Sequence, residues 1–173
     1  MRTWKSLMVL VAVVFAGGLA GCGGGARYDV RVALDDAWVA SGRVPTLEVD
    51  VVGANPTEAA LLNQKDLRAY FSANDEIRTT FPKRTVVFTQ ADTVPKTVPK
   101  SDAVWKTWNQ KGADQMFILV NLPGVSGSLP GDADPRRLVL PLSSDVWLGS
   151  QIDVEVRQSG LVVTTEQQAP TSP

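Results

Sequence analysis

Any chemistry in this chain depends on carboxylates, hydroxyls and amines, because its 173 residues include no histidine and a single cysteine. The usual zinc ligand sets and the histidine-based acid–base mechanisms are therefore excluded. Lys106 could form a Ser-Lys catalytic pair with Ser101 or Ser126, in which the serine is the nucleophile. The spacing of these residues gives such a pair no support. We predict that the protein is not an enzyme. A hydrolase that uses carboxylates alone remains the catalytic alternative.

Two loop segments share part of a ligand-binding pattern. In Gly131–Pro135, Asp132 and Asp134 stand where a calcium loop begins, but the further ligands and the closing glutamate of such a loop do not follow. Asn121–Ser128 carries glycines and serines after an apolar run, yet it lacks the lysine and the following helix of a phosphate-binding loop. We predict polar turns or loops in both segments, and neither a metal nor a cofactor.

Trp105 and Trp108 are three residues apart in a segment with helical signals. They could form a platform for a sugar or for a protein partner. More often, tryptophans at this spacing pack a helix on a sheet. We predict a place in the core for both, with a binding surface as the alternative.

The N-terminal segment predicts export from the cytoplasm. Arg2 and Lys5 precede the uncharged run Leu7–Leu19. This run has the length and flanks of a signal-peptide core, and it is shorter than the roughly 20 apolar residues that a membrane span requires.

The single cysteine, Cys22, ends the sequence Leu19-Ala20-Gly21-Cys22, which resembles the lipobox of bacterial lipoproteins. The resemblance implies cleavage before Cys22, a diacylglycerol on its thiol and an acyl chain on the new amine. It also implies sorting to an outer membrane, facing the periplasm, because Gly23 rather than aspartate follows the cysteine. An ordinary secretory signal beside a structural cysteine is the alternative, but a lone cysteine has no partner for an intramolecular disulfide.

Two or more acyl chains give stable membrane attachment. Residues 23–27 form a glycine-rich tether that reaches at most roughly 18 Å when extended. The domain boundaries that we predict are a signal peptide at 1–21, the lipidated cysteine and tether at 22–27, a folded domain at 28–166 and a disordered tail at 167–173.

The charge balance argues against nucleic acid as a partner. Arg2 and Lys5 leave with the signal peptide, so 15 of the 17 basic residues remain against 18 acidic ones, a net charge of −3. Nucleic-acid binding depends on phosphate neutralisation, and this chain has no basic cluster. Basic residues also give no strong attraction to anionic lipids, so the lipid at Cys22 must carry the membrane contact.

Alternation of apolar and polar residues predicts a β-rich domain with one buried face per strand. In Thr46–Val51 the apolar residues alternate with Glu48 and Asp50, which we therefore expect to face outward. Strands are predicted at Tyr28–Leu34, Thr46–Val51, Leu67–Phe71, Arg84–Thr89, Met116–Val120, Arg137–Leu142, Gln151–Arg157 and Leu161–Thr165. The fold class is mainly β, a single β-sandwich or partly open barrel of about seven to eight strands with one or two short helices.

Helix signals occur at two places. Asn55 can cap a helix with Glu58 completing a capping box, and this helix is expected to end near Gln64. A second helix is expected to begin after Ser101 as its cap and to end at Gly112.

Thr93–Lys96 is repeated as Thr97–Lys100, and each copy contains a proline. Proline excludes a helix and a central strand, so we expect an exposed extended connection. A polyproline ligand motif is the alternative.

The segment Ser41–Val51, which contains Gly-Arg-x-Pro, is similar to the segment before an early strand in the outer-membrane lipoproteins of type VI secretion systems. Asp66–Phe71 falls where that family has an aromatic-rich segment. The resemblance implies a β-sandwich without catalytic residues that binds the periplasmic end of an inner-membrane partner.

Together these features predict a lipid-anchored envelope lipoprotein with a non-enzymatic role in protein binding or structure, as a component of a secretion system. A sheet edge or the loops at one end of the sandwich would make the contact. A module that binds a small ligand or glycan in the envelope is the alternative.

Overall fold

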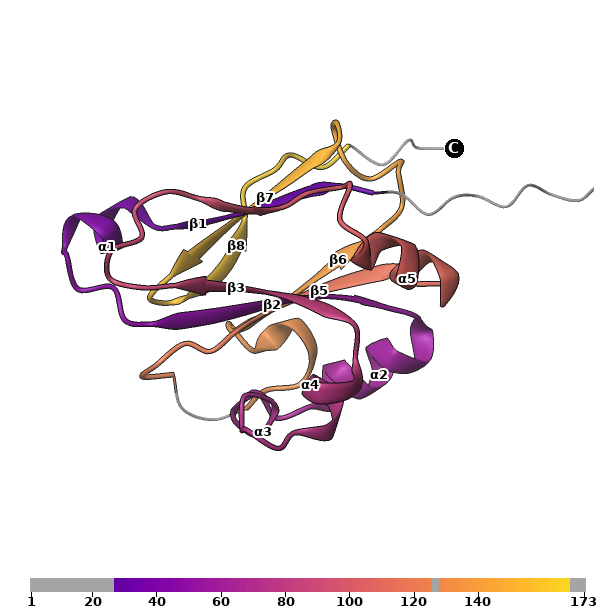
Figure 1. Cartoon of the computed structure of the whole chain (residues 1–173), viewed down its shortest axis with the longest axis horizontal. Helices are drawn as coiled ribbons and strands as arrows, with labels where there is room; N and C mark the ends of the chain where they lie inside the picture. The colour runs from indigo at the N-terminus through magenta and orange to yellow at the C-terminus, as the bar shows by residue number, and fades with distance from the viewer. Residues whose placement is uncertain (1–26, 126–127, 169–173) are drawn as a thin grey trace, which may run out of the picture.

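The computed structural model describes residues 27–125 and 128–168. The predicted signal peptide and Cys22 lie outside the described residues. In the described part, eight strands form two sheets (Figure 1). The strands are β1 Asp29–Leu34, β2 Leu47–Ala54, β3 Lys83–Phe88, β4 Lys96–Val98, β5 Gln115–Val120, β6 Arg137–Pro141, β7 Gln151–Arg157 and β8 Gly160–Val163. The helices are α1 Asp36–Ala40, α2 Pro56–Gln64, α3 Leu67–Tyr70, α4 Glu76–Thr80 and α5 Val104–Gln110, with a 3₁₀ turn at Gly131–Ala133.

The two sheets have four strands each and pack face to face as a β-sandwich, which confirms the mainly β prediction. Sheet A has the order β4-β1-β7-β8, and sheet B has the order β3-β2-β5-β6. The strands β1 and β7 are parallel, with Asp29 opposite Gln151 and Leu34 opposite Val156. All other paired strands are antiparallel.

The main core lies between the sheets, where the inward residues of the alternating strands meet. Val30 and Val32 of β1 and Ile152 and Val154 of β7 are almost fully buried, as their period-two spacing predicts. The helix α5 adds the rings of Trp105 and Trp108 to this core. Burial of apolar surface stabilises a fold by about 25 cal/mol per Å² removed from water.

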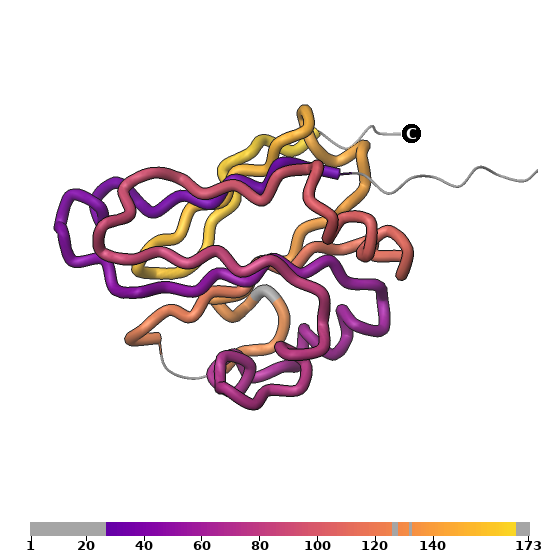
Figure 2. Tube along the Cα trace, in the orientation of Figure 1, coloured from indigo at the N-terminus to yellow at the C-terminus, as the bar shows by residue number. Residues whose placement is uncertain are grey.

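The outer face of sheet B is buried as well, beneath a layer formed by α2, α3 and α4 (Figures 1 and 2). Both faces of β2 and β5 are therefore covered, which accounts for the unbroken apolar run of β5. The second core consists of Val52, Ala54, Ala59, Leu62, Leu67, Tyr70, Phe117 and Leu119. The molecule thus has three layers: sheet A, sheet B and helices.

The prediction of a strand at Leu67–Phe71 was wrong, because Leu67–Tyr70 forms the helix α3. The carboxylate of Asp66 accepts a hydrogen bond from the Ala69 backbone N–H at 2.9 Å and caps this helix. Asp35 and Asp75 cap α1 and α4 in the same way. The additional short helices therefore begin at aspartate caps. At Leu67–Phe71 the strand-like alternation of apolar and polar residues concealed this helix signal.

The capping box at α2 is confirmed: Asn55 and Glu58 each accept a hydrogen bond from the other's backbone N–H, and the helix ends at Gln64. The helix α5 begins later than predicted, because the carboxylate of Asp102, not Ser101, accepts from the Val104 N–H at 2.8 Å. Gly112 follows the helix with a φ of 74°, the left-handed conformation that suits glycine.

The edges of the two sheets lie close to one another, and a hydrogen bond links them on each side. On one side, the Lys96 ammonium donates to the Val87 carbonyl at 2.6 Å and joins β4 to β3. On the other side, the Leu161 N–H of β8 donates to the Pro135 carbonyl at 2.8 Å, just before β6. A charged lysine at an edge also disfavours the addition of another strand.

One sequence expectation needs correction near these edges. The repeat Thr93–Lys100 is only partly a connection, because its residues Lys96–Val98 pair with β1 as an edge strand, where proline neighbours are tolerated. In the segment 167–173, predicted as a disordered tail, Gln167 pairs with Trp147 and the Gln168 N–H donates to the Val146 carbonyl, while residues 169–173 lie outside the described residues. Within residues 27–125 and 128–168, no helix combines the length and apolar character needed to cross a membrane.

Candidate functional site

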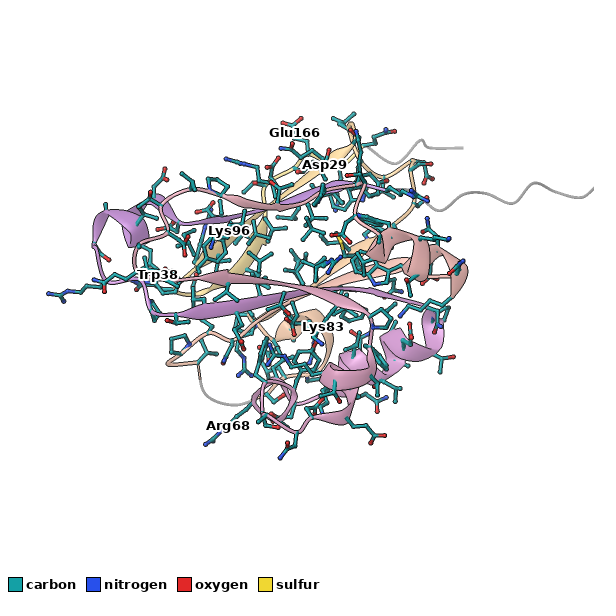
Figure 3. The ribbon with its side chains drawn as sticks, in the orientation of Figure 1. Asp29, Trp38, Arg68, Lys83, Lys96 and Glu166 are labelled. Carbon is teal, nitrogen blue, oxygen red and sulfur yellow. The ribbon has the colours of Figure 1, made fainter. Side chains whose placement is uncertain are left out.

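The two ends of the sandwich are formed by different helices and loops (Figure 3). The chain enters β1 at the end that we call the entry end, where the Asp29 N–H donates to the Ser150 carbonyl. The opposite end, which we call the far end, carries α1, the loop 121–125 and the turn 158–159. Asp29 and Trp38 mark these two ends in the figure.

The first hollow at the far end is a pocket of about 360 Å³, which we call the tryptophan pocket. It is lined by Trp38, Arg43, Pro45, Leu122, Pro123, Gly124, Val125 and Gln158. Trp38 is only 6% exposed. The indole N–H groups of the three core tryptophans, Trp105, Trp108 and Trp147, each donate to a carbonyl.

The second hollow lies where the helical layer meets the end of sheet B, and we call it the helix-side groove. Its volume is about 510 Å³, and it is lined by Asp66, Arg68, Phe71, Asn121, Leu122, Pro123, Gly124, Val125 and Arg136. The loop Leu122–Val125 borders both hollows, so the two flank a single ridge.

Phe71 is held in the groove by a buried polar network beneath it. The Arg78 guanidinium stacks on the Phe71 ring at 4.7 Å from the centroid, and its Nε donates to Asp50 at 2.8 Å. The Tyr70 hydroxyl donates to the same carboxylate at 3.1 Å, and the Thr85 hydroxyl donates at 2.5 Å. Burial and the charge of Asp50 raise the pKa of Tyr70, so its hydroxyl remains a donor.

Asp50 is 0% exposed, so the prediction that it faces solvent was wrong. The alternation of β2 did place it on the face opposite the main core. That face, however, is covered by α3 and α4, and their side chains supply the donors that make a buried carboxylate tolerable.

The segment that suggested a calcium loop serves as a structural clamp. Asp134 is buried and pairs with Arg136, with Nε–Oδ1 and Nη2–Oδ2 distances of 2.9 and 2.8 Å. Burial works to raise the pKa of Asp134, but the hydrogen bonds from Arg136 outweigh it and leave that pKa below its usual value. Arg137 donates to four carbonyls, among them Asn63 and Gly131, and ties the end of α2 to this loop.

Trp105 and Trp108 lie in the main core, edge to face with a centroid distance of 4.8 Å. Both are 0% exposed, so neither ring is available at the surface in this structure. Arg68 and Phe71, which line the helix-side groove, were named from the sequence only within the segment Asp66–Phe71 and not as site residues. Their local spacing does not mark them as such, because each hollow combines segments that are distant in the sequence, such as 66–71 and 121–125.

A third cavity of about 340 Å³ lies on the outer side of sheet A. It is lined by Arg31, Ala33, Leu34, Asp36, Thr93, Val94, Pro95, Asp153, Val154, Glu155 and Thr164. This lining carries no aromatic ring, and Arg31 pairs with Asp153 at 3.2 Å. Sugar-binding sites rely on aromatic platforms, so the cavity gives the glycan alternative no support.

The loop between β3 and β4 contains a carboxylate that we expect to titrate far below the usual range. Hydrogen bonds from Lys96 and Thr89 lower the pKa of Asp92 to about 2. Because the folded pKa is depressed, its contribution to stability is present above the unfolded value of 3.8 and is lost as pH falls through about 2. The carboxyl ¹³C shift of Asp92 should therefore titrate near pH 2, and Lys96→Gln should move the midpoint toward 3.8. A midpoint near 3.8 in the unaltered protein would refute this assignment.

Comparison with known proteins was made by sequence and by structure. No protein-family model matches this sequence, and neither does any curated protein. Three solved structures have the same fold. The type VI secretion lipoprotein TssJ1 of Pseudomonas aeruginosa is 13% identical with a TM-score of 0.52, and the match covers 84% of this chain and 99% of TssJ1.

Serratia marcescens Lip, a membrane-bound component of the type VI secretion system, is 12% identical with a TM-score of 0.50, and the match covers 80% of this chain and 97% of Lip. A chain in a structure of the type VI secretion protein TssM C-terminal domain from EAEC is 15% identical with a TM-score of 0.51; the match covers 79% and 98%. The chain has the fold of type VI secretion lipoproteins. The resemblance seen at Ser41–Val51 is thus confirmed at the level of fold.

Proposed function

We propose that this chain is a lipid-anchored lipoprotein of the cell envelope and a non-enzymatic, protein-binding component of a secretion system. The observation that carries the proposal is the fold that it shares with TssJ1 and Lip, joined to the lipobox-like sequence that ends at Cys22. On this proposal the protein faces the periplasm from an outer membrane.

The position of the chain entry supports a role for the far end in binding. Cys22 is five residues from Arg27, which precedes the entry end, and such a tether spans at most roughly 18 Å. An anchor at Cys22 would hold the entry end near the lipid and leave the far end directed away from it. A partner that approaches from the periplasm would then meet α1, the loop 121–125 and the two hollows first.

Loops rather than strand addition are favoured as the mode of contact. The edges β4 and β3 are joined through Lys96, and β8 lies against the residues before β6. Strand addition requires a row of free backbone groups on an open edge, and the charged Lys96 on β4 disfavours it there. The far end, in contrast, presents hollows with exposed arginines.

The site chemistry supports binding over catalysis. The carboxylates near the far-end hollows serve structural roles: Asp66 caps α3, and Asp134 pairs with Arg136. A carboxylate-only hydrolase requires two acids whose pKa values are pushed apart, whereas the pKa values of both these groups are lowered.

The anchor is tested by Cys22→Ser in the native host. Intact-mass analysis of the unaltered protein should show loss of residues 1–21 and addition of a diacylglycerol, and the protein should fractionate with membranes. The Cys22→Ser variant should lose this lipid mass and leave the membrane fraction after cleavage. A leader that remains attached, or a bare thiol on a soluble protein, would contradict the proposal.

Partner binding is tested with a photo-crosslinking residue at position 43 or at position 106. Position 43 lies at the far end, whereas position 106 lies on α5 at the entry end (Figure 1). The proposal expects a reproducible crosslink to one envelope protein from position 43 and none to that protein from position 106. Equal labelling from both positions would argue against a far-end site.

A further inference from the structure

The two far-end hollows share a chemistry that indicates the kind of segment they accept. They flank the ridge Leu122–Val125, and each hollow carries one exposed arginine, Arg43 in the tryptophan pocket and Arg68 in the helix-side groove. A chain that crosses the ridge would contact both hollows. This inference rests on the proposed function.

The acidic residues around the hollows are engaged in the fold. Asp66 accepts from the Ala69 N–H, and this hydrogen bond holds the pKa of Asp66 below its usual value. Asp134 binds Arg136. By contrast, the guanidinium groups of Arg43 and Arg68 form no ion pair within residues 27–125 and 128–168. Among their lining residues, the tryptophan pocket carries one charged group, Arg43, and the helix-side groove carries Arg68 and Arg136 against the single carboxylate of Asp66, so each lining is net positive.

The hollows also offer apolar surface. Phe71 lines the groove with its ring beside the Arg78 guanidinium, and Val125 lines both hollows and is partly exposed. Leu122 is only 4% exposed, so it contributes mainly to the core.

We propose that the far end binds an extended segment of a partner protein in which acidic residues alternate with apolar ones. Arg43 and Arg68 each bind a carboxylate, on opposite sides of the ridge. Apolar side chains of the segment pack on Phe71 and Val125. Guanidinium groups bind carboxylates in a two-point geometry, so the segment is selected for acidic residues rather than for bulk alone.

Fluorescence anisotropy with two labelled heptapeptides tests this proposal on residues 23–173, the mature chain without its lipid-bearing residue. One probe alternates aspartate with leucine, and the other alternates lysine with leucine. The aspartate probe should bind, and the lysine probe should bind at least about tenfold more weakly. Affinity for the aspartate probe should fall as NaCl is raised from about 50 to about 500 mM, because the arginines are exposed.

Charge-reversal variants locate the site. Arg68→Glu and Arg43→Glu should each weaken the aspartate probe about tenfold or more, and Arg68→Gln should weaken it less. Lys106→Glu is the matched control, since Lys106 is exposed at the entry end and undergoes the same change of charge. It should change the affinity less than about twofold. Circular dichroism should show that all four variants remain folded.

Three results would overturn the proposal: no binding of the aspartate probe at millimolar concentration, equal affinity for both probes, or equal effects of Arg68→Glu and Lys106→Glu. Binding of anionic vesicles that Arg68→Glu abolishes, without probe binding, would also overturn it in favour of a lipid headgroup. If position 43 crosslinks an envelope partner but Arg68→Glu leaves that crosslink intact, the proposed function stands and the acidic segment is wrong. Probe binding that depends on both arginines, without any such partner, would support the acidic segment and contradict the proposed function.

Discussion

Asp50→Ala should lower the free energy of unfolding by about 3–5 kcal/mol, the usual cost of removing one partner from a buried ion pair. Asp50 is fully buried and accepts hydrogen bonds from Tyr70, Arg78 and Thr85. The substitution removes the acceptor of all three donors and leaves the Arg78 charge in a site that is mostly screened from water. Urea denaturation followed by circular dichroism measures the loss.

Glu48→Ala is the matched control for this experiment. Glu48 binds the same guanidinium, with an Nη2–Oε2 distance of 3.0 Å, but its side chain is 38% exposed. Exposed ion pairs contribute about 0–1 kcal/mol, so the loss should be small. Equal losses for Asp50→Ala and Glu48→Ala would show that burial of Asp50 does not set the strength of this network.

The same substitution should also weaken the far-end site. The network fixes α3 and α4 on sheet B, and Arg78 holds the Phe71 ring that lines the helix-side groove. We expect Asp50→Ala to reduce binding of the aspartate probe even under conditions in which the protein is still folded. Stability of the helical layer and recognition at the groove are therefore coupled through Arg78.

Gly53→Ala should lower the free energy of unfolding by about 2–3 kcal/mol, the upper part of the range for overpacked cores. A Cβ atom at Gly53 would lie 2.5 Å from Cγ and Cδ2 of Trp108, well inside van der Waals contact. Trp108 is fully buried, and its indole N–H donates to the Pro82 carbonyl at 2.8 Å, so the ring has little freedom to move. Thermal and urea unfolding of the variant measure the effect.

A double-mutant cycle with Trp108→Ala isolates the clash. Alanine removes the Cγ and Cδ2 atoms that a Cβ at Gly53 would meet at 2.5 Å, so Gly53→Ala should cost much less in the Trp108→Ala background. Additive losses from the two substitutions would contradict the clash, as would a loss below about 0.5 kcal/mol for Gly53→Ala alone.

Several features of this protein follow from local sequence. Alternating residues identified β1, β2 and β7, because one face of each strand must enter the core whatever its neighbours are. The capping box of α2 is likewise a contact within four residues. The lipobox-like segment and the lack of histidine are also properties of the sequence itself, and they directed attention to binding rather than catalysis.

The tertiary structure decided what covers the outer face of sheet B. Alternation separates the two faces of a strand, but it does not say whether the second face meets water or a helix. The burial of Asp50 depends on Tyr70 and Arg78, which are 20 and 28 residues away. The strand prediction for Leu67–Phe71 failed for a local reason instead, since Asp66 caps a helix there.

The sequence thus determined most of the strands and predicts the export signal and the anchor, because each depends on neighbouring residues. The far-end hollows arise only when α1, α3 and the loop 121–125 converge, and their arginines are distinguished by the ion pairs that their neighbours have already formed. Which charges remain unpaired is decided by contacts between distant segments, and a linear pattern does not encode those contacts.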